Sequence, residues 1–478
     1  MGKGGRHMTL SMGHIISIIA TLFLIAFVGV YSVKKVKNSS DFSGSGKKAN
    51  WRIVGGTIIG TLVGAATTVG TAQLAFVYGV SAWWYALGTG TACLILAVVY
   101  TKKLWYSNSQ TVPDIIYREY GKAANICMSI MLCISLMLSV IPQVLALSSM
   151  LSSMLQIGLI AGTILAIVLM IVYVVFGGVW GTGLAGVCKT ILIYCSMVIA
   201  GIAVWNLSGG TSGYTDNLPD FPYFSMWGRG VSVGIGGFIS AIIGVLASQT
   251  YIQAICSGKD VKAGRIGALA SAILIPPIAF AAVLVGMYMK IHFPDINPGS
   301  AFPLFVLQYL NPYVGGIILG AILISVIGSG AGITLGFATI VTNDIYKKIF
   351  KPNATDKELL FVLRFFIVVS LAITFVFTYG NLKSLMLQWT FLSFGIRGTA
   401  GFLPLIFALF LKGKVRPKMA LIGMTLGPIG LIGWKFFGNQ AIDPVYLGLI
   451  IVAAFMIIGY AMGPGKEKAE LTKDEELF

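Results

Sequence analysis

The sequence predicts an all-α polytopic membrane protein with thirteen transmembrane helices. Of its 478 residues, 57% are hydrophobic and only 10% are charged, a composition that no soluble domain of this size has. The apolar residues form long runs, each close to the roughly 20 residues that cross a bilayer as a helix. The charged residues lie mainly in the short segments between these runs. Together, the runs and the intervening segments predict repeated crossings of a membrane.

The positions of the basic residues predict the orientation of the chain. The net charge is +17, yet 24 of the 33 Lys and Arg residues lie in six short segments, at 34–52, 102–122, 259–265, 347–357, 412–418 and 466–473. Short basic loops are typical of the cytoplasmic side of a membrane protein, so we expect no nucleic-acid partner. One orientation places all six segments in the cytoplasm. We therefore expect a multi-pass protein of the cell membrane (plasma or inner), with the N-terminus outside and the C-terminus inside.

The predicted spans follow one another with short connections and form a single transmembrane domain over residues 14–463. An extracytoplasmic tail at 1–13 precedes this domain, and a cytoplasmic tail at 464–478 follows it. The thirteen spans are expected at 14–33, 53–79, 80–101, 124–156, 158–178, 183–206, 231–256, 264–290, 313–346, 358–380, 384–411, 418–437 and 443–463.

The second span is predicted to be a broken helix. Five of its glycines, at 55, 56, 60, 64 and 70, weaken a helix, and the hydroxyls of three of its threonines, at 67, 68 and 71, compete for backbone hydrogen bonds. Irregular backbone at membrane depth persists only where protein buries it or where it lines a cavity. Such a break offers free carbonyl and amide groups to a solute or ion. The alternative is that the glycines only allow close packing of helices.

The seventh span repeats this composition. Its glycines at 234, 236, 237 and 244 precede a polar end that includes Gln249 and Gln253. It lies five spans after the first broken span and enters from the opposite side. Two interrupted helices in this relation predict an inverted repeat with a binding site at the midplane. The repeats would be spans 2–6, at about 53–206, and spans 7–11, at about 231–411, with one further helix before them and two after.

The predicted spans contain few groups for chemistry. No Asp, Glu or His lies in the interior of a span, so neither a carboxylate proton relay nor an intramembrane metalloenzyme is expected. We therefore predict no enzyme activity and no cofactor. Polar side chains on the two broken spans are candidate solute ligands, because amides and hydroxyls donate and accept hydrogen bonds. These candidates, which alternatively join helices to each other, are Thr67, Thr68, Gln73, Gln249 and Gln253.

The sequence resembles the sodium:solute symporter family over nearly its whole length. Members are thirteen-helix transporters with two inverted five-helix repeats, and they use a sodium gradient to accumulate small solutes. The resemblance thus implies a secondary active transporter working by alternating access. The matching stretches are GTAQLAFVYGVSAWWYALG (70–88), TVPDIIYREYG (111–121), FGGVWG (176–181), SQTYIQAICSGKDVKAGR (248–265), FPDINPGSAFPLFVLQYL (293–310) and VTNDIYKKIF (341–350).

The resemblance also implies positions for a sodium site, and there the sequence departs from the family. Carbonyl groups near Gly60 and Val63 and the ninth span near Ser325, Gly328 and Ser329 would bind Na⁺. The family's pair of adjacent hydroxyls aligns with Gly328-Ser329, so one hydroxyl is missing. Its supporting Thr-Asp aligns with Ala185-Gly186, so the carboxylate is missing too. With these losses, Na⁺ would depend on Gly60, Val63, Ser325 and Ser329.

Lys189 suggests a replacement for the ion. It lies about 9 Å into the sixth span by helical rise, one turn after the missing carboxylate. Its ammonium group would supply the missing charge and donate to the remaining oxygens. A buried ammonium gives up its proton more readily than an exposed one, so protons would take the place of sodium in coupling. The alternative is that Lys189 extends to the cytoplasmic headgroups.

Arg397 suggests the solute. It lies about thirteen residues from either end of the eleventh span, where a guanidinium is costly unless it faces a cavity or a partner. Its planar fork suits a carboxylate, which predicts a small anion as the solute; the alternative is a contact with helix-end carbonyls. Sugars are not expected, because the aromatic inner gate of sugar-transporting members falls near Gly244 and Val245.

The predicted function is secondary active transport of a small polar organic solute, with Na⁺ or H⁺ as the coupling ion and the bilayer as surroundings. One alternative is a Na⁺-independent transporter in which Lys189 replaces the ion. Another is a membrane sensor of the solute that acts through a separate partner protein. A channel is less consistent with the sequence, which has no ring of like charges and no repeated filter sequence.

Overall fold

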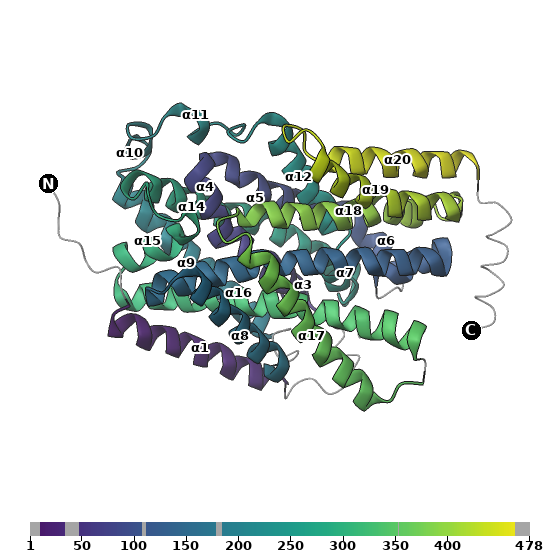
Figure 1. Ribbon diagram of the computed structural model, residues 1–478, viewed down its shortest axis with the longest axis horizontal. Coiled ribbons are helices and arrows are strands. Elements are labelled where there is room, and N and C mark those ends of the chain that lie inside the picture. Colours follow the sequence, from purple (N-terminus) through teal and green to yellow (C-terminus); the bar gives the residue numbers. More distant parts are fainter. Residues whose placement is uncertain (1–9, 34–46, 108–110, 178–183, 352, 464–478) are drawn as a thin grey trace.

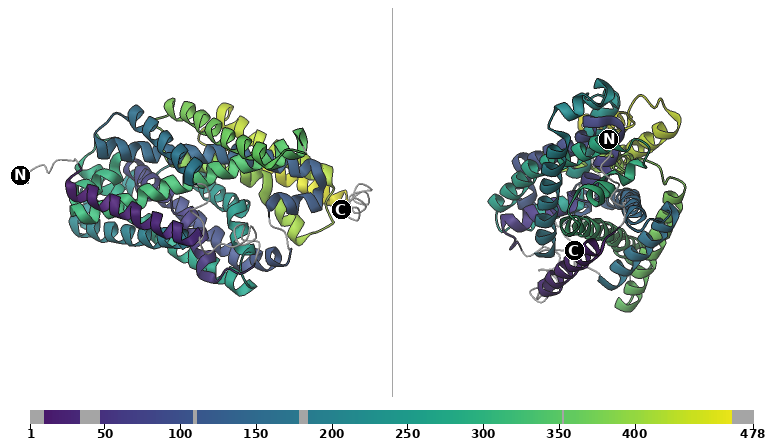
Figure 2. Two further views of the ribbon diagram at one scale, coloured as in Figure 1. Left: turned by 90° about the horizontal axis from the view of Figure 1, so that it is seen from below. Right: turned by 90° about the vertical axis from the view of Figure 1, so that its left-hand side faces the viewer.

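The computed structural model describes residues 10–33, 47–107, 111–177, 184–351 and 353–463 (Figure 1). The predicted tails fall mostly outside this part of the chain, at 1–9 and 464–478. Within the described ranges the protein is helical, with one isolated β-bridge between Ala49 and Gly258 and no strand. Most long helices run along the long axis of the molecule, and Figure 2 shows many of them end-on in its right-hand view.

The helices are long and apolar enough to make this a polytopic membrane protein. Eight described helical segments could each cross a bilayer, or nine if the bent pair Val231–Leu246 and Gln249–Cys256 is one span. Three shorter apolar helices accompany them, at Met12–Ile25, Leu159–Val174 and Val445–Ala461. An all-α membrane fold is therefore confirmed for the described residues.

The helices follow the predicted spans closely along the chain. The first half contains α1 (Met12–Val33), α3 (Trp51–Leu62), α4 (Thr71–Tyr78), α5 (Trp84–Ile95), α6 (Thr101–Tyr106), α7 (Val112–Leu155), α8 (Leu159–Gly177) and α9 (Leu184–Ser208). The second half contains α10 (Ser212–Thr215), α11 (Asp220–Tyr223), α12 (Val231–Leu246), α13 (Gln249–Cys256), α14 (Val261–His292), α15 (Ala301–Tyr309), α16 (Pro312–Ile340), α17 (Asp356–Tyr379), α18 (Met386–Phe410), α19 (Pro417–Phe437) and α20 (Val445–Ala461).

Both predicted broken spans are confirmed. In the first, α3 ends at Leu62, residues 63–65 are not helical, and a π-helical turn, η1 (Ala66–Gly70), leads into α4. In the second, α12 and α13 meet at a bend of 47°. The glycines and hydroxyl residues of these spans therefore mark interruptions of the helix and do not serve close packing alone.

Several short elements were not predicted. The interval expected to be a basic loop at 102–122 contains α6 and the first turns of α7, which bends at Gly121 where φ is +85°. The connection between the predicted spans 264–290 and 313–346 contains α15, and the connection before α12 contains α10 and α11. Their lengths of four to nine residues are too short for hydrophobic periodicity to identify.

The long helices pack in two groups. In the first group, α14 packs against α3, α4 and α5, and α5 packs against α12. In the second, α7, α8, α16 and α17 pack against one another. Helix α18 lies against α7 of one group and α12 of the other, and α9 contacts α14 and α16. The break in the first broken span lies between the groups, because η1 contacts α14 as well as α7.

Candidate functional site

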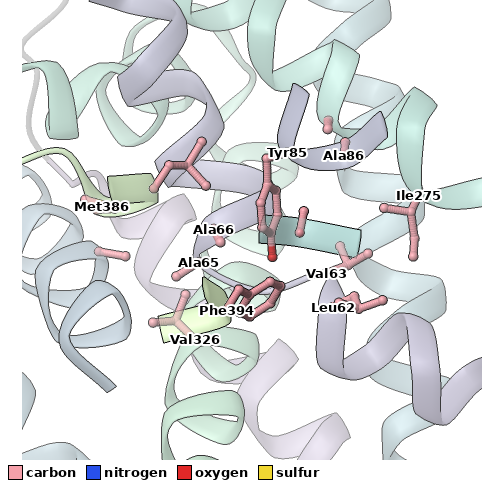
Figure 3. Packing of buried hydrophobic residues seen from close by; sticks show 14 of the residues in the cluster. Leu62, Val63, Ala65, Ala66, Tyr85, Ala86, Ile275, Val326, Met386 and Phe394 are labelled. Carbon is pink, nitrogen blue, oxygen red and sulfur yellow. The ribbon is translucent and has the colours of Figure 1, made fainter. Parts of the chain in front are cut away.

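The break between α3 and η1 exposes carbonyl groups that neighbouring hydroxyls partly satisfy. The Thr67 hydroxyl donates to the carbonyl of Leu62 at 2.6 Å, and the Thr68 hydroxyl donates to that of Gly64 at 2.9 Å. Both threonines are buried. Their hydroxyl protons therefore complete the backbone of the break, as groups at membrane depth must be satisfied inside the protein. Figure 3 shows the rings of Tyr85 and Phe394 beside the break.

Lys189 of α9 reaches across to α16 at this break. Its Nζ donates to the carbonyl of Ser325 and to the hydroxyl of Ser329, each at 3.1 Å. The Ser325 hydroxyl in turn donates to the carbonyl of Val63 at 3.2 Å. The ammonium group therefore lies against α16, and Ser325 joins that helix to the break. Lys189 is bound within the protein and does not extend to the headgroups.

The glycines around Lys189 leave the space it uses. A Cβ atom at Gly328 would have the Nζ of Lys189 and the hydroxyl oxygen of Tyr173 as its nearest neighbours, each at 3.9 Å. The position of the missing hydroxyl thus faces the ammonium group. On the other side, a Cβ at Gly64 would lie 3.1 Å from the Ser329 hydroxyl. The break and α16 approach each other this closely because Gly64 has no side chain.

Arg397, on α18, is a buried cation with no ion-pair partner among the residues that the structure describes. Its side chain is 4% exposed, and its Nε has no hydrogen-bond partner among the described residues. The guanidinium lies over the ring of Phe394, with its Cζ 4.0 Å from the ring centroid. The phenol groups of Tyr85 and Tyr251, from α5 and α13, lie near it. The alternative, a contact with helix-end carbonyls, is not seen in the described structure.

Helix α18 presents a row of residues that ends at Arg397. Gln388, Phe391, Phe394 and Arg397 follow at intervals of three, so each lies beside the next on the helix surface in a row that winds around α18, which we call the α18 row. The ring of Tyr85 packs against Phe391 and Phe394 of this row, with centroids 5.9 and 6.1 Å apart. Phe394 therefore covers the guanidinium of Arg397, and Tyr85 links that ring to Phe391.

Comparison with known proteins identifies the family. Residues 42–427 match the sodium:solute symporter family. The chain belongs to this family. The relatives described below are named as a symporter and a transporter, and neither is named as an enzyme.

The relatives of this symporter family chain are distant. It is 27% identical over 202 residues to the sodium/proline symporter of Escherichia coli strain K12, an alignment that covers 39% of either chain. It is 23% identical over 385 residues to the human high affinity choline transporter 1, covering 74% of this chain and 66% of the relative. The aligned part is thus less than two thirds of each of these relatives.

Solved structures agree on the fold. A Na⁺-coupled sialic acid symporter in a substrate-bound outward-open state aligns with a TM-score of 0.73 at 18% identity, covering 94% of this chain and 97% of that one. A nucleobase-cation-symport-1 family transporter aligns with a TM-score of 0.56 at 10% identity, over 89% and 96% of the chains. At these identities the likeness concerns the fold alone.

The structure brings some of the predicted site residues of this symporter family chain together. Val63, Ser325 and Ser329 form one cluster with Lys189, and Gly60 is buried one turn earlier in α3. The expected loss of a carboxylate at Ala185-Gly186 concerns side chains outside the described part of the structure. Gln143, buried in α7, was not predicted; its unpartnered Oε1 would lie 3.8 Å from a Cβ at Gly64. In the sequence, only the neighbouring Pro142 indicated an irregular helix at this position.

The predicted amide ligands mainly hold backbone. Gln73 accepts from the N–H of Met386 at 2.8 Å and donates to the carbonyl of Ser384 at 3.1 Å, so it fixes the start of α18. Gln249 accepts from the N–H of Val112 at 2.8 Å, at the start of α7. Gln253 lies partly buried in α13. These contacts fit the alternative of helix-joining hydrogen bonds for Gln73 and Gln249.

Phe394 and Tyr85 are the main residues that sequence reasoning missed. Phe394 fills the space beside Gly244, where a Cβ would collide with its side chain. An aromatic ring therefore does stand near Gly244, but α18 supplies it. The signal was present in the sequence, since Phe394 precedes Arg397 by one helical turn.

We expect Gln73→Met to destabilise the protein without a specific effect on the solute. The change leaves the N–H of Met386 and the carbonyl of Ser384 without partners, at about 1–3 kcal/mol for each buried group. The measurement is the melting temperature of the purified protein, with apparent KM as the second readout. Gln308→Met is the matched control, because the Oε1 of Gln308 has no partner to lose. A stable Gln73→Met variant with a raised KM would return Gln73 to the solute site.

Proposed function

We propose that this protein is a secondary active transporter of a small carboxylate solute in the cell membrane. The observation that carries the proposal is the buried, unpaired guanidinium of Arg397. Removing the partner of a buried charge costs several kcal/mol, and a cation within a membrane span is costly in the same way. A bound carboxylate would offset this cost. The planar guanidinium of arginine binds a carboxylate by donating two parallel hydrogen bonds to its oxygens.

Two of the similar proteins support a carboxylate. One is named for proline and one for sialic acid, and both of these solutes carry a carboxylate group. The choline transporters are named for a cation. In this chain the protein itself supplies positive charge in the interior, through Arg397 and Lys189. No carboxylate pairs with either side chain in the described structure.

The coupling ion is the second part of the proposal. Family membership and the sodium symporters among the relatives support Na⁺ coupling at Gly60, Val63, Ser325 and Ser329. The contacts of Lys189 support a different arrangement, because its ammonium group already engages the Ser325 carbonyl and the Ser329 hydroxyl. We infer that Lys189 is a tethered cation that takes the place of sodium. Loss and gain of its proton would then couple transport to the proton gradient.

The architecture supports alternating access. Two groups of helices pack within themselves, and the break in the first broken span lies where the groups meet, as expected for a site opened first to one side and then to the other. Helix α1 begins at one end of the molecule and α20 ends at the other, in keeping with an odd number of crossings (Figure 1). Thirteen spans, two inverted repeats and an extracytoplasmic N-terminus are parts of this proposal.

A sensor with a separate partner is the rival function. Transport and sensing differ in flux, so a transporter exchanges labelled solute across liposomes by counterflow, whereas a pure sensor binds the solute without flux. Uptake into proteoliposomes under separately imposed Na⁺ and pH gradients, with a panel of small carboxylates, therefore tests the function and the coupling together.

For Lys189, we expect wild-type uptake to depend on a pH gradient and to persist without Na⁺. Lys189→Ala should lower the gradient-driven initial rate at least about tenfold, the equivalent of about 1.4 kcal/mol, because the tethered charge is lost. Lys262→Ala, an exposed lysine in the first turn of α14, is the control and should retain the wild-type rate. Strict Na⁺ dependence of wild-type uptake, undiminished in Lys189→Ala, would contradict the tethered cation and restore Na⁺ coupling.

For Arg397, we expect Arg397→Lys to raise the apparent KM for a transported carboxylate about tenfold, because the charge stays but the fork is lost. The measurement is the concentration dependence of initial uptake. Arg364→Lys makes the same chemical change at an exposed position on α17 and should leave KM unaltered. An unchanged KM in Arg397→Lys would exclude direct contact between this guanidinium and the solute.

A further inference from the structure

A cavity of about 280 Å³ lies where α12 and α20 begin, α18 begins and α19 ends. It is near the lower end of the range for small-molecule sites, so it suits a small solute. All four of these helix ends belong to the face that we assign to the outside. The polar and aromatic lining that concerns us here consists of Arg229, Gln388, Phe391, Lys435, Gln440 and Asp443.

Arg229 is held in place without being neutralised. It precedes α12, and its Nη1 is buried without a hydrogen-bond partner among the described residues. Its Cζ lies 5.5 Å from the centroid of Phe391. The preceding segment is fixed by Trp84, which donates to the carbonyl of Met226 at 2.7 Å and packs against Trp227. The backbone at Arg229 is therefore anchored while its guanidinium keeps unused donors.

The carboxylate in the cavity has another role. Asp443 accepts from the N–H of Val445 at 3.0 Å at the start of α20, and no ion pair joins it to Arg229 in the described structure. Arg229 and Lys435 together outweigh this one carboxylate. The cavity therefore favours an anion.

The α18 row leads from this cavity toward Arg397. Gln388 and Phe391 line the cavity, and Phe394 and Arg397 are the next two residues of the row. Phe391 and Arg397 are six residues apart, or about 9 Å by helical rise. One guanidinium lies over Phe391 and the other over Phe394, and Tyr85 packs against both rings. The three rings therefore connect the two guanidinium groups in one chain of contacts.

We propose that this cavity is an outer capture site for the carboxylate group of the solute, with Arg229 as its anchor and the Phe391–Tyr85–Phe394 cluster as the barrier to Arg397. The assignment rests on the proposed transport of a carboxylate. It adds a second binding position, a second cation in Lys435 and the aromatic cluster through which the solute passes.

The test measures protection of a cysteine placed in the cavity. In the purified full chain carrying Gln440→Cys, the rate of modification by a membrane-impermeant thiol reagent is followed with increasing acetate, lactate or pyruvate, each against its own amide. Gln440 is exposed and lines the cavity. We expect protection by the carboxylates and none by the amides, since the amides have the same size but lack the charge.

Variants in the same background assign the effect. Arg229→Gln should raise the half-protecting concentration about tenfold, and Arg229→Lys should raise it severalfold while keeping the charge and the fold. Asp443→Asn keeps the oxygen that caps α20, and it should lower the half-protecting concentration because a competing negative charge is removed. Lys290→Gln removes a cation that also lies over a ring, that of Phe76, but outside the cavity, and should change nothing.

The outcomes separate this inference from the proposed function. Equal protection by amides, or carboxylate protection unchanged in both Arg229 variants, overturns the capture site. Carboxylate uptake without any protection at position 440 overturns it too and leaves the proposed transport intact. Protection that follows Arg229 in a protein that does not transport carboxylates supports the site and contradicts the proposed function.

Discussion

Backbone polar groups in the membrane interior must find partners within the protein, and the break in the first broken span is where this constraint is most severe. Three kinds of group meet it. Thr67 and Thr68 donate to carbonyls of the break itself, Ser325 donates from α16 to Val63, and Lys189 donates to α16 from α9. The break is thus held by hydroxyls and an ammonium group. In a sodium symporter, a bound ion would supply the positive charge that the ammonium group supplies here.

The same constraint explains why the two interior cations differ. Lys189 has acceptors from the protein, whereas Arg397 has aromatic rings and phenol groups around it and no acceptor in the described structure. A group that the protein satisfies is a structural or coupling element. An unsatisfied buried group needs an explanation, and for Arg397 we propose that the explanation is a ligand. In this account the first cation replaces an ion and the second receives the solute.

The sequence alone was sufficient to predict the long apolar helices and both breaks, because hydrophobic runs and glycine clusters are local signals. It also predicted that Lys189 approaches Ser329, through the spacing to the position of the missing carboxylate and a family resemblance. It did not assign Gln73 correctly between two roles, since the partner backbone at Ser384 and Met386 lies more than 300 residues away. Tyr85, Phe394 and Gln143 were missed for the same reason: their importance comes from contacts between distant segments.

The central claim is that an ammonium group occupies the place of a sodium ion, and the most direct test is thermal stability of the purified protein in NaCl against KCl at equal ionic strength. A ligand at 100 times its Kd stabilises a protein by about 2.7 kcal/mol, which a melting curve detects readily. The account predicts equal melting temperatures for the wild type in the two salts. A saturable rise in melting temperature that is specific to Na⁺ would contradict it.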